Sequence, residues 1–127
     1  MPKKSLLIVD VDAYDASVYA NRFERAGWKV WVEEHFANAK KRLQRCSPDV
    51  VIAQLEPLDE ALAFFVGLRE NTKTAKTLQV ALTTLGGRGI MHEALSAGVD
   101  AYLLKGHFAP SEAVKKIKRL LEEKSSL

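Results

Sequence analysis

The chain has 127 residues, of which 47% are hydrophobic and 28% are charged. This composition is ordinary for a single folded domain, residues 1–127, with its own core, and it argues against a disordered chain. Nineteen basic and sixteen acidic residues give a net charge of +3, which permits an anionic partner without requiring one. Cys46 is the only cysteine, so neither an internal disulfide nor a thiolate metal site can form.

Neither a membrane span nor a secretory signal is expected. No apolar run approaches the ~20 residues that cross a bilayer, and the basic start leads directly into a short strand-like segment. We therefore expect a cytoplasmic protein without a membrane partner. Basic residues gather in two predicted helices, at 40–45 and 115–119, without interleaved aromatic residues or a DNA-binding motif, so nucleic-acid binding is only a minor alternative.

The first half of the chain alternates between strand and helix patterns. An apolar run ends in Asp10 and Asp12, and the next segment repeats apolar residues at helical spacing until Gly27 stops it. The run 49–57, DVVIAQLEP, is a buried strand that Gln54 interrupts abruptly. In order, the pattern predicts strands at 5–9 and 28–32, a helix at 36–45 and the strand that begins at 49.

The second half continues this alternation. A strongly apolar helix should be well buried, and a polar loop leads to a strand that closes in Thr83 and Thr84. Pro110 opens a last amphipathic helix. The other predicted elements are a helix at 59–70, a strand at 78–84, a glycine-rich turn at 86–89, a helix at 90–97 and a strand at 101–104. Strands alternating with helices predict an α/β fold, with a parallel sheet and helices on both faces.

Polar residues follow most of the predicted strands at their carboxyl ends. Parallel strands bring those ends to one edge of the sheet, where open α/β folds usually place ligand chemistry. The set consists of Asp10, Asp12, Gln54, Thr84 and Lys105. With the segments LLIVD, SPDVVIAQL and AGVDAYLLK, it resembles the CheY-like receiver domain of bacterial response regulators in two-component signalling, over essentially the whole chain.

The resemblance implies a flavodoxin-like (βα)5 three-layer sandwich, with a five-stranded parallel sheet of order 2-1-3-4-5. It also implies a phosphorelay, in which a partner histidine kinase transfers a phosphoryl group to an aspartate at the end of strand three. Acidic residues hold Mg²⁺ there, and a threonine and a lysine hold the phosphoryl oxygens. Thr84 and Lys105 match that threonine and lysine, and Asp10 matches the first acid.

Two positions depart from the family pattern. Gln54 occupies the phosphoacceptor position, and a carboxamide cannot form an acyl phosphate. Val11 stands where the principal metal-ligating acid is found, which leaves Asp10 as one firm carboxylate. The sequence therefore predicts a degenerate pseudo-receiver that is not an enzyme, with no catalytic residue, no cofactor and weak or absent Mg²⁺ binding.

The surroundings of the site also differ from the family. Leu85 should partly fill the phosphoryl pocket, Gly106 replaces a proline, and Pro57 comes one residue early, which predicts a remodelled loop. Because position 54 carries no charge, we expect a permanent contact between Lys105 and Asp10, with the amide of Gln54 bridging them. The alternative is that Gln54 faces solvent.

Other residues have ordinary explanations beside functional ones. Tyr102 matches the switch aromatic of the family, or it is simply a half-buried strand tyrosine. Glu56 and Asp59 are better explained as loop and helix-start acids than as substitute phosphoacceptors. The three histidines, at 35, 92 and 107, lack metal-ligand spacing, and the turn at 86–89 lacks the ending of a phosphate-binding loop.

The sequence thus predicts a phosphorylation-independent signalling module that acts by protein contact, with another signalling protein, an output domain or a second copy as partner. The expected surface lies on helix 4, strand 5 and helix 5, and consists of Ile90, Glu93, Tyr102, Lys115, Lys118 and Arg119. Two alternatives stay open. One is phosphorylation of a substitute carboxylate such as Asp12, and the other is small-molecule sensing in the vacated pocket.

Overall fold

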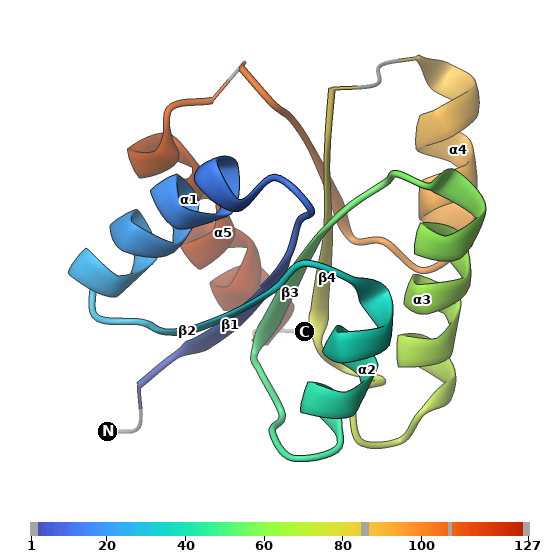
Figure 1. Ribbon diagram of the computed structural model, residues 1–127, viewed down its shortest axis with the longest axis horizontal. Coiled ribbons are helices and arrows are strands. Elements are labelled where there is room, and N and C mark those ends of the chain that lie inside the picture. The colour runs from blue at the N-terminus through green and yellow to red at the C-terminus, as the bar shows by residue number, and fades with distance from the viewer. Residues whose placement is uncertain (1–2, 85–86, 107, 126–127) are drawn as a thin grey trace.

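A computed structural model of the chain describes residues 3–84, 87–106 and 108–125. Within these residues, five parallel strands form one sheet in the order β2-β1-β3-β4-β5 (Figure 1). The strands are β1 (Ser5–Val9), β2 (Lys29–Glu33), β3 (Val50–Gln54), β4 (Leu78–Thr83) and β5 (Ala101–Leu104). The helices are α1 (Ala13–Arg25), α2 (Phe36–Leu43), α3 (Leu58–Glu70), α4 (Arg88–Ser96) and α5 (Pro110–Ser125). The flavodoxin-like fold class and the strand order 2-1-3-4-5 are confirmed.

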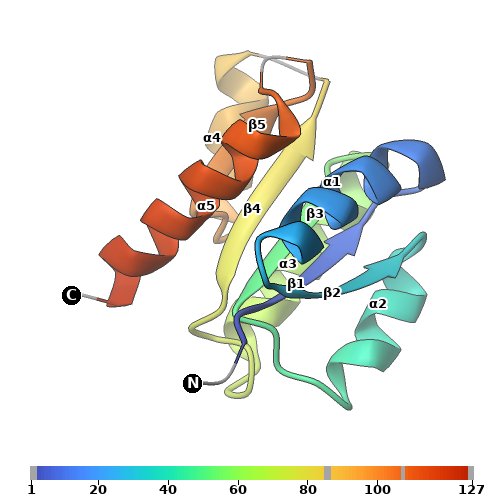
Figure 2. The same cartoon turned by 90° about the vertical axis from the view of Figure 1, so that its left-hand side faces the viewer.

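The helices cover both faces of the sheet. Helices α1 and α5 lie side by side on one face, and α2, α3 and α4 cover the other (Figures 1 and 2). Along β1, Leu6 and Ile8 face the first layer, whereas Leu7 and Val9 face the second. All four side chains are buried. Because both faces of the central strands are covered, these strands read as continuous apolar runs rather than as alternating ones.

Most predicted boundaries agree with the structure within two residues. The helix expected at 36–45 is two residues shorter in the structure, because α2 ends at Leu43 with Gln44 as its C-cap. Lys73, in the loop after α3, donates from Nζ to the Gln44 carbonyl oxygen at 3.0 Å. The Gln44 carbonyl would lack a helical donor in any case, because the residue four positions later is Pro48, which has no backbone N–H. The ammonium of Lys73 satisfies this carbonyl instead.

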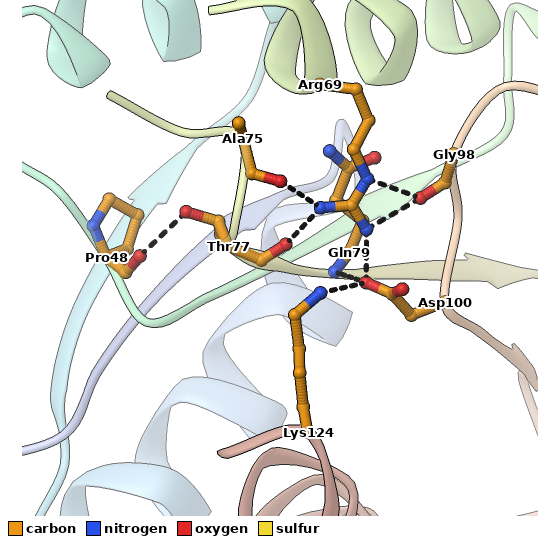
Figure 3. Close-up of polar contacts among 8 residues, drawn as sticks. All are labelled: Pro48, Arg69, Ala75, Thr77, Gln79, Gly98, Asp100 and Lys124. Carbon is orange, nitrogen blue, oxygen red and sulfur yellow. Dashed lines mark hydrogen bonds and ion pairs between the residues drawn. The ribbon is translucent and has the colours of Figure 1, made fainter. Parts of the chain in front are cut away.

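Arg69, near the end of α3, ties several chain segments together at the amino edge of the sheet (Figure 3). Its guanidinium forms an ion pair with the carboxylate of Asp100. That carboxylate accepts two further hydrogen bonds, from the Gln79 backbone N–H at 2.9 Å and from Lys124 Nζ at 3.4 Å. The carbonyl acceptors of Arg69, at 2.7 to 3.1 Å, are those of Ala75, Thr77 and Gly98. One side chain thereby fixes the loop before β4 and the turn before β5.

Candidate functional site

The carboxyl edge of the sheet gathers the predicted polar residues. Asp10 directly follows β1, Gln54 ends β3 and Lys105 directly follows β5. Backbone hydrogen bonds hold these exits in register, since the Asp10 N–H donates to the Glu33 carbonyl at 3.1 Å and the Lys105 N–H to the Thr83 carbonyl at 2.8 Å. The side chains from three strands are therefore brought to one place by the sheet itself.

Lys105 forms ion pairs with two carboxylates. Its Nζ lies 2.9 Å from Asp10 Oδ2 and 3.3 Å from Asp15 Oδ2. The side chain of Asp10 is completely buried, and that of Lys105 is 18% exposed. Burial opposes the charged form of Lys105, but the contacts with Asp10 and then Asp15 outweigh it and raise the pKa of the lysine. The predicted contact between Lys105 and Asp10 is confirmed.

Both carboxylate oxygens of Asp10 are already engaged. Oδ1 accepts a hydrogen bond from the Asp12 backbone N–H at 2.9 Å. Oδ2 lies 2.9 Å from the Lys105 ammonium, with which it forms an ion pair. Asp12 in turn caps α1 by accepting from the Asp15 backbone N–H at 3.0 Å. This cap fixes the first turn of α1, from which Asp15 reaches Lys105.

Gln54 does not bridge Lys105 and Asp10, so that part of the prediction is wrong. Its Nε2 donates to the Glu56 carbonyl oxygen at 2.9 Å, and its Oε1 accepts from the Val11 backbone N–H at 3.2 Å. The alternative of a solvent-facing amide is also wrong, because Gln54 is only 9% exposed. The two loops offer backbone partners close to the amide, and Asp15 takes the place beside Lys105 that the amide was expected to fill.

The remaining site residues take no part in the ion pairs of Lys105 with Asp10 and Asp15. Val11 is 56% exposed. Thr84 is also exposed, and its Oγ1 lies 3.5 Å from Glu56 Oε1. Gly106 takes a left-handed backbone conformation, with φ of +84°. Leu85, Gly86 and His107 lie outside the described residues.

Two contributors were not found from the sequence. Asp15 was not singled out from the sequence, and only the fold shows that the first turn of α1 brings it to Lys105. Thr83 is buried at the end of β4, whereas Thr84 is not. Tyr102 is half-buried in β5; burial raises its pKa, and a side-chain hydrogen bond with Thr83 acts in the opposite direction. On the sequence alone, Thr84 rather than Thr83 is matched to the threonine of the family.

The residues at this edge do not suit Mg²⁺. A hard divalent cation requires several oxygen ligands, and carboxylates are the usual ones. Asp10 is committed to Lys105 and to a backbone N–H, Val11 offers no oxygen, and the oxygen of Gln54 accepts from the backbone. Across the described ranges, no group of three or more histidine, cysteine, aspartate or glutamate side chains could hold a metal. The Lys105 ammonium supplies the positive charge that Asp10 requires.

A shallow hollow of about 360 Å³ lies beside Gln54. Its lining combines the apolar Val11 and Phe36 with three glutamates. The full lining is Val11, Glu34, His35, Phe36, Gln54, Glu56, Pro57 and Glu60. No described residue of the hollow is a lysine or arginine, so its character is acidic.

On the side of β5, α4 exposes a short apolar stripe. Met91 and Leu95, four residues apart, are 41% and 56% exposed. Of the predicted interaction residues, Ile90 and Tyr102 are half-buried, and Glu93 and the three basic residues of α5 are exposed.

Among the described segments, none forms a helix long and apolar enough to span a bilayer.

No family model matches the chain, and no curated protein matches it. Solved structures do. A response regulator from Thermotoga maritima is 20% identical, with a TM-score of 0.87 over 95% of this chain and 99% of that one. A CheY-like receiver domain protein from Methanospirillum hungatei is 20% identical, with a TM-score of 0.88 over 98% of each chain.

A third structure is the receiver domain of a sensor histidine kinase from Pseudomonas aeruginosa, which holds a magnesium ion in its active site cleft. It is 17% identical, with a TM-score of 0.80 over 99% of this chain and all of that one. These likenesses extend over nearly the whole described structure, although few residues are shared. The chain therefore has the fold of the response regulator receiver domains.

Proposed function

We propose that the chain is a signalling module of the receiver type that works without phosphorylation and acts through protein contacts. One observation carries this proposal: the Lys105 ammonium is already paired with Asp10 and Asp15, while Gln54 stands at the end of β3 with its amide bound to the backbone. A carboxamide cannot become an acyl phosphate, and the lysine that would hold a phosphoryl group is already neutralised.

The proposed contact surface lies on α4, β5 and α5. The apolar Met91 and Leu95 on α4 supplement the residues expected from the sequence, and Lys115, Lys118 and Arg119 give α5 a basic rim. An apolar patch with a charged rim is the usual composition of a protein interface. A basic rim favours acidic partners chiefly by accelerating association.

The phosphorylation claim is tested with acetyl phosphate and Mg²⁺, followed by intact-mass spectrometry. We expect no adduct of about 80 Da, the mass that a phosphoryl group adds. A receiver domain that has an aspartate at the acceptor position provides the positive control under the same conditions. A stoichiometric adduct on a carboxylate would contradict the proposal, and mapping it to Asp12 would establish the substitute-acceptor alternative.

The acidic hollow beside Gln54 favours a second candidate, a sensor of a small cationic molecule. Its lining offers an apolar floor and the three carboxylates of Glu34, Glu56 and Glu60. A ligand that binds only the folded chain raises its melting temperature with concentration. A screen of small amines by thermal shift, repeated on Glu60→Gln, tests this candidate. If no amine raises the melting temperature of either wild type or Glu60→Gln, the candidate is rejected.

A further inference from the structure

A groove between α2 and α3 lies away from the ion-pair cluster, toward the amino edge of the sheet. Its volume is about 490 Å³. Its floor consists of the buried side chains Leu43, Phe64 and Leu68. The other lining residues are Lys40, Gln44, Ala63, Gly67, Asn71, Lys73 and Thr74. Figure 1 shows the two helices next to each other at this place.

Gly67 is an exposed residue in the lining of this groove. It lies inside α3, where glycine is about 1 kcal/mol less favourable than alanine. Packing does not explain the glycine, because a β-carbon added there would meet no atom within 4 Å. Its φ is not in the left-handed region either. A side chain at this lining position would instead occupy space at the mouth of the groove.

The charge around the groove has one sign. Lys40 and Lys73 stand on its rim, and no aspartate or glutamate lines it. Lys73 is fixed by its bond to the Gln44 carbonyl oxygen, and neither lysine forms an ion pair with a described acid. The groove is therefore an apolar floor between unneutralised ammonium groups.

We propose that the α2–α3 groove binds an acidic amphipathic segment of a partner protein. Apolar side chains of that segment would pack on the exposed Ala63 and Gly67 and on the edges of Leu43 and Leu68 that reach the groove. Its carboxylates would meet Lys40 and Lys73. Six of the ten lining residues are exposed, so the groove is too open to enclose a small molecule as ligand pockets do. An apolar groove between helices is instead typical of peptide recognition. This surface is independent of the one proposed on α4, β5 and α5.

A random 16-residue peptide library displayed on phage provides the probe. The chain is the target, and Gly67→Gln serves for counter-selection. We expect enriched peptides to combine two or more large apolar residues with flanking Asp or Glu. A synthetic copy of the leading peptide should shift amide resonances of α2 and α3, and its affinity should fall with salt because the rim contacts are ionic.

Two matched pairs of variants make the test specific. Gly67→Gln should weaken binding at least about tenfold while leaving or raising the melting temperature, whereas Gly89→Gln in α4, whose β-carbon also meets no atom within 4 Å, should not change binding. Lys40→Glu should weaken binding more than Lys41→Glu, which makes the same charge change outside the groove lining.

Three results would overturn the proposal. The first is selection without enrichment, and the second is enrichment of peptides that lack acids. The third is equal binding to wild type and Gly67→Gln. If selection fails and decanoate shifts the same resonances, the groove accepts a small apolar acid instead. If the resonances of α2 and α3 change with protein concentration alone, its occupant is a second copy.

Discussion

Lys105 Nζ lies 2.9 Å from Asp10 Oδ2 and 3.3 Å from Asp15 Oδ2, so one ammonium from the exit of β5 joins two carboxylates on either side of the start of α1. Asp10 is fully buried and has no other charged partner in the described structure. We therefore expect this contact to be needed for the stability of the carboxyl edge of the sheet.

Replacing Lys105 by Met should lower the free energy of unfolding by about 3 kcal/mol, because it leaves a buried carboxylate without its cation. Asp15→Asn should cost less than about 1 kcal/mol, since the Asp15 side chain is 38% exposed and solvent screens the pair. Urea unfolding at pH 7 measures both changes. A Lys105→Met protein as stable as wild type would contradict the inferred role of the ion pair.

The ion pair should also give the stability a characteristic alkaline dependence. The pKa of Lys105 is raised above its ordinary value of 10.5, because its pairing with Asp10 and Asp15 outweighs burial. Its contribution is therefore complete below that ordinary value, and it is lost as the pH rises through the higher folded value. The stability difference between wild type and Lys105→Met should stay constant from pH 8 to about pH 10 and shrink above it.

The comparison between these two proteins is needed because tyrosines also titrate at high pH. Burial raises the pKa of both Tyr19 and Tyr102, which makes the folded state less stable in alkali for a separate reason. Both tyrosines remain in Lys105→Met, but the charge of Lys105 lowers the pKa of Tyr19, so the comparison is made in a Tyr19→Phe background. A stability difference that does not change up to pH 11.5 would contradict the assignment to Lys105.

The fold could be predicted from the sequence because its strongest signals are local. The strands β1 and β3 are buried on both faces, so each reads as an apolar run that ends in a polar residue. Once the carboxyl ends of β1 and β5 are placed at the same edge of the sheet, the opposite charges of Asp10 and Lys105 predict their pairing. The orientation of Gln54 was not, because backbone groups of two loops decide it. The α2–α3 groove depends on tertiary packing and left no motif in the sequence.

Replacing Gln54 by a carboxylate alone should not create a metal site. Gln54→Asp adds one oxygen ligand, but Val11 still offers none and Asp10 stays paired with Lys105. We expect saturable Mg²⁺ binding, measured by calorimetry, only when Val11→Asp is added as well. Val11→Asn with Gln54→Asp is the matched control for side-chain size. Tight Mg²⁺ binding by wild type would contradict the inference that the carboxyl edge of the sheet does not suit this ion.

Gln54→Asp should also be less stable than wild type by about 1 kcal/mol, because it loses the amide N–H that donates to the Glu56 carbonyl. Gln54→Glu retains the length of the side chain but still lacks the donor, so it should lose a similar amount. Thermal unfolding without metal measures both variants. If either is more stable than wild type, the bond to Glu56 is not stabilising.

Gly98 lies beside Arg69 at the amino edge of the sheet, so substituting it tests how firmly the contacts of Arg69 hold that side chain. Its φ is +104°, and a β-carbon there would lie 2.6 Å from Arg69 Cγ. Gly27 has a φ of +94° with no atom within 4 Å of the same position, so it isolates the backbone effect. Gly27→Ala should cost about 1 kcal/mol and Gly98→Ala about 3 kcal/mol, because Arg69 is held by its carbonyl acceptors and cannot easily move away.

A double-mutant cycle separates the collision from the backbone strain. In an Arg69→Ala background, Gly98→Ala should cost no more than Gly27→Ala does in wild type, because the atom that its β-carbon would strike is gone. Arg69→Ala itself should be strongly destabilising, since the carbonyls of Ala75, Thr77 and Gly98 lose their common donor. Chemical denaturation of the four proteins gives the coupling energy. A coupling near zero would show that Gly98 is required for its φ alone.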